Sequence, residues 1–160
     1  MPSANSVAAL ALLKLHKITE KISYREKAAT TLQLFAVNLE RGGRGVPYLM
    51  MALDFYLHEP YRVVVAGKPG GSEFQKALHA VHNQYQPNRV ILGNAGPVEP
   101  FAKKQTPDED GPLVYVCSGT ACQLPTRDSK EIQSHLKIAP PTSNDLPSGN
   151  AKKPDASEEK

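Results

Sequence analysis

The hydrophobic pattern of this chain changes its period near Pro60, and this change limits the fold more than any other feature. Residues 5–57 place apolar side chains at helical spacings, whereas residues 62–66 (RVVVA) and 89–92 (RVIL) are short β-branched runs. Such runs are typical of strands that are covered on both faces. A chain of 160 residues has room for one domain of ordinary size. We therefore predict a mixed α/β fold, with helices first and a small sheet after them.

Three helices are predicted before Pro60, and two of them have almost no polar face. Apolar residues fill nearly every position of 7–15, and residues 48–57 are apolar apart from Asp54. The helix between these two is amphipathic, begins at a capping box over residues 23–26 (SYRE) and ends at residues 42–43 (GG). Helices that are apolar on most sides need neighbours on most sides. These three cannot cover one another completely, so they either wrap the sheet or belong to something larger.

The residues after Pro60 predict a small α/β unit. Residues 62–66, a helix capped by Ser72 and residues 89–92 form a βαβ unit with parallel strands. A third strand over 113–117 follows a Pro-rich loop. We expect a three-stranded, mostly parallel sheet.

The same patterns divide the chain into three parts. Terminal helices occupy residues 2–58, and the α/β unit occupies residues 60–137, with a last helix from the Asp128 cap to Leu136. Residues 139–160 are rich in Pro, Ser, Asn, Asp, Lys and Glu, with a single Leu. This tail cannot bury enough apolar surface to offset chain entropy, so we predict that it is disordered.

Charge and hydropathy argue against two classes of partner. The net charge of +3 is mild and lacks any aromatic-basic alternation, so we expect no nucleic acid. The apolar run 7–13 is far shorter than the ~20 residues of a spanning helix, so we expect no membrane span. Lys14 and Lys17 follow this run, whereas a signal peptide places basic residues before it. We therefore expect a cytoplasmic protein, in which cysteines are more often reduced.

The two cysteines, Cys117 and Cys122, lie at a strand exit with C-x4-C spacing. Gly119 allows a turn that could bring them to the ~5.5 Å Cα separation of a disulfide. The spacing matches neither a C-x-x-C redox centre nor a zinc knuckle, and His135 would add at most one ligand. Packed thiols, a redox pair and a shared metal all stay open. We favour ordinary reduced thiols that react slowly, and we predict no metal site.

A Gly-rich turn between the first strand and its helix is a candidate anion site, because backbone N–H groups and the helix dipole favour negative charge there. Its residues are Gly67, Lys68, Gly70, Gly71 and Ser72. The turn matches neither GxxxxGK(S/T) nor GxGxxG, and Glu73 places negative charge where a phosphate would lie. A plain βα turn is the favoured interpretation.

Other polar residues carry weaker hypotheses. His79 and His82 are three apart on a predicted helix and could be two metal ligands, but half-buried or surface histidines fit better. Asp54 and Glu59 could form a glycosidase-like carboxylate pair, but residues five apart do not share a helix face. We predict solvated acids and no cofactor.

Three separated motifs resemble one known family. They are residues 2–9 (PSANSVAA), residues 86–92 (QPNRVIL), and residues 115–117 (YVC) with 122–125 (CQLP) and Asp128. In this order they resemble the carboxy-terminal end of the spermatogenesis-associated protein 20 family, whose bacterial members are called thioredoxin-domain-containing proteins. The resemblance covers roughly residues 2–137.

The resemblance implies a longer parent protein, in which a thioredoxin-like domain precedes an (α/α)6-type helical toroid similar to six-hairpin glycosidases and N-acylglucosamine epimerases. This chain would be the non-catalytic carboxy-terminal structural segment. Its partners would be the missing toroid and thioredoxin-like domain, or other copies through exposed helices. Two alternatives stay open. One is a part of a sugar-processing enzyme, with Asp54 or Tyr48 facing a shared pocket, and the other is a small thiol-redox or anion-binding module.

Overall fold

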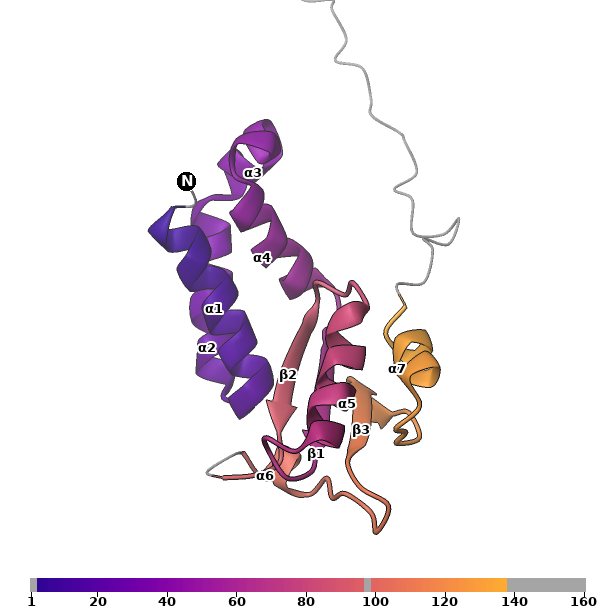
Figure 1. Ribbon diagram of the computed structural model, residues 1–160. Coiled ribbons are helices and arrows are strands. Elements are labelled where there is room, and N and C mark those ends of the chain that lie inside the picture. Colours follow the sequence, from indigo (N-terminus) through magenta and orange to yellow (C-terminus); the bar gives the residue numbers. More distant parts are fainter. Residues whose placement is uncertain (1–2, 97–98, 138–160) are drawn as a thin grey trace, which may run out of the picture.

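The structure is a computed structural model that describes residues 3–96 and 99–137, with a helical part followed by a small α/β part (Figure 1). The disorder predicted for residues 139–160 lies outside these ranges. The predicted order of helices first and a sheet after them is confirmed.

Four α-helices and one short 3-10 turn make up the helical part, namely α1 (Ala4–Thr19), α2 (Ile22–Leu34), α3 (Ala36–Gly42), η1 (Gly43–Gly45) and α4 (Pro47–Leu57). Helix α1 packs against both α2 and α4. Its N-cap, Ser3, accepts a hydrogen bond from the Ser6 amide at 3.2 Å. It ends at Glu20, which adopts a left-handed conformation with φ 59°.

The predicted second helix was wrong in two details. The capping box does not form, because α2 begins at Ile22 and places Ser23 inside the first turn. Lys21 precedes the helix and makes no side-chain cap. The chain then breaks at Phe35, so one predicted helix becomes α2 and α3.

The sheet has four strands in the order β2-β1-β3-β4, namely β1 (Tyr61–Ala66), β2 (Arg89–Gly93), β3 (Leu113–Ser118) and β4 (Ala121–Cys122). Strands β1 and β2 are parallel and flank α5 (Ser72–Asn83), as predicted for a βαβ unit. Strand β3 is antiparallel to both β1 and β4. The expected three-stranded, mostly parallel sheet was therefore wrong.

The physical reason lies in the connection between β2 and β3. Gly93 ends β2 beside Val65, and Leu113 begins β3 beside Ala66, so the chain leaves and re-enters the sheet at the same end of β1. No crossover is needed, and β3 runs against β1. The connection contains the short helix α6 (Pro100–Lys103).

Two apolar clusters hold the parts together. One face of the sheet carries Val63, Val65, Val114 and Val116, which pack against α5 and α7 (Ser129–His135). Asp128 caps α7 as predicted, because its side chain accepts from the amides of Lys130 and Glu131. The second cluster joins α1, α2 and α4 and includes Val90 of β2, so the helical part contacts the sheet at that strand.

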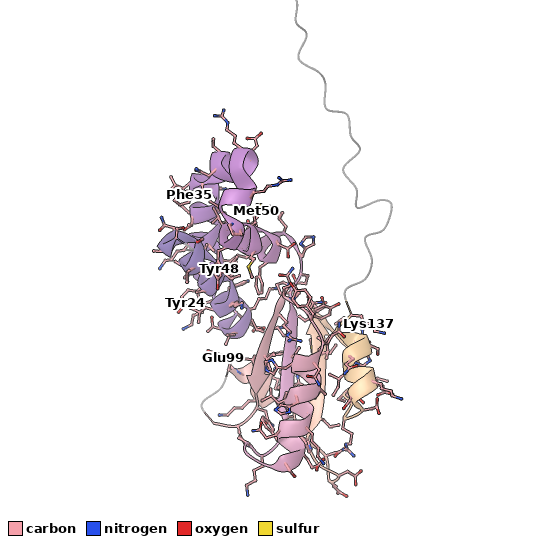
Figure 2. All side chains as sticks on the ribbon, turned by 45° about the horizontal axis from the view of Figure 1, so that its top comes forward. Tyr24, Phe35, Tyr48, Met50, Glu99 and Lys137 are labelled. Atoms are coloured by element: carbon pink, nitrogen blue, oxygen red, sulfur yellow. A yellow bond between two sulfur atoms is a disulfide. The ribbon has the colours of Figure 1, made fainter. Side chains whose placement is uncertain are left out.

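The helices leave much apolar surface uncovered. Exposed fractions reach 58% at Ile22, 76% at Leu34, 57% at Val37 and 66% at Leu57. Tyr48 and Met50 of α4, labelled in Figure 2, are also exposed. Within the described ranges, no helix is both long enough and apolar enough to cross a membrane.

Candidate functional site

The cysteines lie on a β-hairpin at the edge of the sheet. Strands β3 and β4 are joined by the two residues Gly119 and Thr120, and Cys117 pairs directly with Cys122 in the ladder. Gly119 has φ 57°, as a two-residue hairpin loop of type II′ requires at its first position. The predicted turn therefore brings the cysteines together, although the two-residue strand β4 was not predicted.

The structure joins the two sulfur atoms in a disulfide, with Sγ–Sγ 2.00 Å and Cα–Cα 3.9 Å. The prediction that Cys117 and Cys122 are reduced thiols is therefore wrong for this structure. The next residue pair carries a backbone hydrogen bond, from the Gln123 amide to the Val116 carbonyl at 2.9 Å. The cysteines thus occupy a non-hydrogen-bonded position of the hairpin, where opposed side chains approach most closely. This position explains how a C-x4-C spacing closes a bond.

The two sulfur-bearing residues differ in access to solvent. Cys117 is 1% exposed, whereas Cys122 is exposed on the edge strand β4. His135, the third ligand considered for a metal, lies on α7, which covers the face with Val116 rather than the face with Cys117. Among the described residues, no three His, Cys, Asp or Glu side chains come together as a metal site.

Arg62 extends the row of cysteines across the sheet. It pairs with Cys117 in the β1–β3 ladder, so Arg62, Cys117 and Cys122 lie on one face in adjacent strands. The Arg62 guanidinium donates to the Glu20 carboxylate and, at 3.4 Å, to the Gly119 carbonyl in the hairpin loop. It also stacks on the Phe101 ring at 3.8 Å from the ring centroid.

The hairpin therefore lies where the helices meet the sheet, a region that we call the joint. A hollow of about 270 Å³ at this joint is lined by His16, Lys17, Glu20, Glu59, Arg62 and Gly119. Lys17 of α1 pairs with Glu59, which precedes β1, so two ion pairs cross the joint. Charged pairs of this kind fix orientation more than they add stability.

Two backbone amides of the candidate anion turn already donate hydrogen bonds within the protein. The Gly67 amide donates to Asn94 Oδ1 at 3.0 Å, and the Gly71 amide donates to the Lys68 carbonyl at 3.4 Å. Helix α5 starts at Ser72, and Gly71 rather than Ser72 is its N-cap.

The charge at this turn also disfavours an anion. The Lys76 ammonium donates a hydrogen bond to Glu73 and lowers the pKa of that carboxyl. Glu73 therefore stays negative in the first turn of α5, where a bound anion would lie. Lys68, Gly70 and Ser72 are exposed. The arrangement fits a plain βα turn.

The remaining polar candidates are separated or already paired. His79 and His82 are both exposed on α5. Asp54 accepts a hydrogen bond from Asn88 at 2.6 Å and pairs with His58 at 2.9 Å. Glu59 forms an ion pair with Lys17 instead, so Asp54 and Glu59 do not form a carboxylate pair.

A groove in the helical part was missed by the sequence analysis. It has a volume of about 770 Å³, and side chains of α1, α3, η1 and α4 line it together with Tyr85, Pro87 and Asn88. Asp54 is part of its wall, whereas Tyr48 is not among its lining residues. A second hollow of about 420 Å³ shares Leu39, Glu40 and Met50 with it. The uncovered apolar positions of α4 were the available signal.

These observations define an α/β segment whose helices expose several large apolar side chains and whose cysteine hairpin lies where helices and sheet meet. Its relatives are known. The chain is homologous to a segment of spermatogenesis-associated protein 20, and the proteins of that name from Rattus norvegicus, Mus musculus and Homo sapiens are each 30% identical to it over 142 residues.

The alignments cover 84% of this chain but 18% of each relative, so the chain spans about a fifth of their length. The predicted relationship is confirmed at the level of a shared segment. No protein-family model matches the chain. No solved structure matches it either.

Proposed function

We propose that this chain is a non-catalytic structural segment that packs, through the exposed face of its helices, against further helices of a longer protein related to spermatogenesis-associated protein 20. The observation that carries the proposal is the uncovered apolar surface of α1 to α4, which borders the groove of about 770 Å³. Large apolar patches that stay exposed to solvent mark interaction surfaces.

Two features support a covering made of helices. The groove runs between α1 and α4, which already pack against each other and leave Met50 and Met51 39% and 46% exposed. Methionine side chains adapt to an incoming helix because they are long and unbranched. The relatives have ample further chain, since the aligned segment is 18% of their length. A helical toroid, of which α1 to α4 would be the last members, is the specific architecture that we propose.

The test compares polar substitutions in the groove with one outside it. Met50→Gln combined with Met51→Gln should lower the binding of a hydrophobic dye severalfold, with little change in melting temperature, because both side chains are already half exposed. The matched control is Leu124→Gln. Leu124 is 84% exposed outside the helical part, so its replacement should leave dye binding unchanged. Equal dye binding by all three proteins contradicts a docking face at the groove.

A second candidate is that the segment contributes to a sugar-processing site, which the position of Asp54 in the wall of the groove favours. The proposal is weaker because the Asp54 carboxylate is held by Asn88 and His58. In a full-length relative that has an Asp at the position of Asp54, its replacement by Asn should abolish turnover of a sugar substrate if the residue is catalytic. Unchanged turnover would show that Asp54 has a structural role and not a catalytic one.

A further inference from the structure

We propose that Cys117 and Cys122 form a reversible disulfide that exchanges with thiols, and that the Cys122 sulfur is the one an incoming thiolate attacks. This role goes beyond the structural function, and it would hold whether or not the helical face docks against other helices.

Access selects the attacked sulfur. Exchange begins when a thiolate approaches one sulfur of the disulfide, so the rate depends on which sulfur can be reached. Cys122 is exposed, and β4 is the last strand of the sheet. Cys117 is 1% exposed, on the strand β3 between β1 and β4. An attacking thiol therefore meets Cys122 first.

Charge favours departure of the other sulfur. Arg62 lies directly opposite Cys117 in the ladder, and its guanidinium reaches the hairpin loop at the Gly119 carbonyl. A nearby cation stabilises a thiolate and makes it a better leaving group. Glu20 pairs with the same guanidinium and weakens its effect. The opposing charges of Arg62 and Glu20 together set how readily the Cys117 sulfur departs as a thiolate.

The exchange needs a thiol as its co-reactant, and glutathione serves as the probe. Its thiolate bonds to the Cys122 sulfur while the Cys117–Cys122 bond breaks, and Cys117 departs with the electron pair and takes a proton from water. A second glutathione thiolate then attacks the glutathione sulfur of the mixed disulfide. Cys122 leaves as a thiolate, and oxidised glutathione is released. The protein gains two electrons and two protons, and oxidised glutathione reverses both steps.

The first experiment locates the attacked sulfur in the whole 160-residue chain. Cys117→Ser leaves Cys122 alone, and Cys122→Ser leaves Cys117 alone. With oxidised glutathione, the Cys122 thiol should form the mixed disulfide at least about tenfold faster than the Cys117 thiol, because access controls the rate. Equal rates, or faster reaction of Cys117, would overturn the assignment.

The second experiment uses the unmodified chain, so it does not depend on the folding of a variant. The protein is equilibrated over a roughly thousandfold range of reduced to oxidised glutathione ratios, quenched with acid and analysed by mass spectrometry after alkylation. A reversible pair should pass from mostly oxidised to mostly reduced within that range. A pair that stays fully oxidised or fully reduced throughout would contradict the proposal.

A third comparison tests the positioning role of Arg62. In the Cys122→Ser background, Arg62→Met should raise the pKa of the Cys117 thiol, Arg62→Lys should largely restore it, and Glu20→Gln should lower it. The pKa is read from the pH profile of alkylation. If Arg62 has only a packing role, the pH profile of alkylation should be the same in all three variants. That result would exclude Arg62 from the exchange.

Discussion

Arg62 of β1 and Glu20, the residue that ends α1, form an ion pair that ties the sheet to the helices. The Arg62 side chain is 16% exposed and is held on its other sides by the Phe101 ring and the Gly119 carbonyl. Glu20 is 63% exposed, so water screens its half of the pair. The joint between the two parts thus depends more on Arg62 than on Glu20.

Arg62→Gln should lower the free energy of unfolding by about 1 to 2 kcal/mol, because it removes both the stacking on Phe101 and the ion pair. Glu20→Gln should cost less than about 1 kcal/mol. Urea unfolding of the two variants gives the comparison. Lys76→Gln, which breaks an exposed ion pair within α5, is the matched control and should behave as the wild type. Equal losses in the two joint variants would show that Arg62 has no larger role than Glu20.

Reduction of the disulfide should destabilise the chain measurably. Closing a loop as short as residues 117–122 contributes about 2 kcal/mol to stability, chiefly through the unfolded state. Urea unfolding with and without dithiothreitol should differ by roughly this amount. The double variant Cys117→Ala with Cys122→Ala should not respond to the reductant. Identical curves for the wild-type chain under both conditions would argue that the bond constrains nothing.

The approach of the two cysteines could be predicted from the sequence, whereas their disulfide and part of the surrounding sheet could not. Gly119 is the residue that a tight turn needs, and its position halfway between the cysteines indicated their approach. The strand β4 was missed because two residues are too few to show the alternation of apolar and polar side chains that marks a strand. The direction of β3 was also missed, since a long connection is compatible with either a crossover or a return at the same end of the strands.

Other features were missed for reasons of two kinds, one local and one tertiary. The break at Phe35 carries no Pro or Gly, and Leu32, Phe35 and Leu39 continue the helical spacing across it, so periodicity alone extends one helix over the break.

The partners of Arg62 could not be predicted, because Glu20 and Phe101 come from distant segments that only the tertiary fold brings together. The helix α4 and the cap of α7 were predicted because Pro47 and Asp128 act through their immediate neighbours.

Gly67 should be intolerant of any side chain. A Cβ at this position would lie 2.8 Å from the Pro112 Cβ, and the residue has a φ of 157°. Gly67→Ala should therefore lower the free energy of unfolding by about 1 to 3 kcal/mol, as overpacking typically does. Gly93→Ala is the control, because nothing lies within 4 Å of its would-be Cβ. A similar melting temperature for both variants would mean that Pro112 moves away without cost.

The helices of this chain are incompletely covered, and the association state of the chain is the sharpest test of this finding. Light scattering coupled to gel filtration, over a range of micromolar concentrations and with a hydrophobic dye, reports both association and exposed apolar surface. We predict dimers or larger species and strong dye binding, because α1 to α4 expose large apolar side chains, among them Ile22, Leu34 and Leu57. Exposed apolar patches larger than the ~300 to 600 Å² of a typical monomer mark interaction surfaces. A sharp monomeric peak at every concentration, without dye binding, would contradict it.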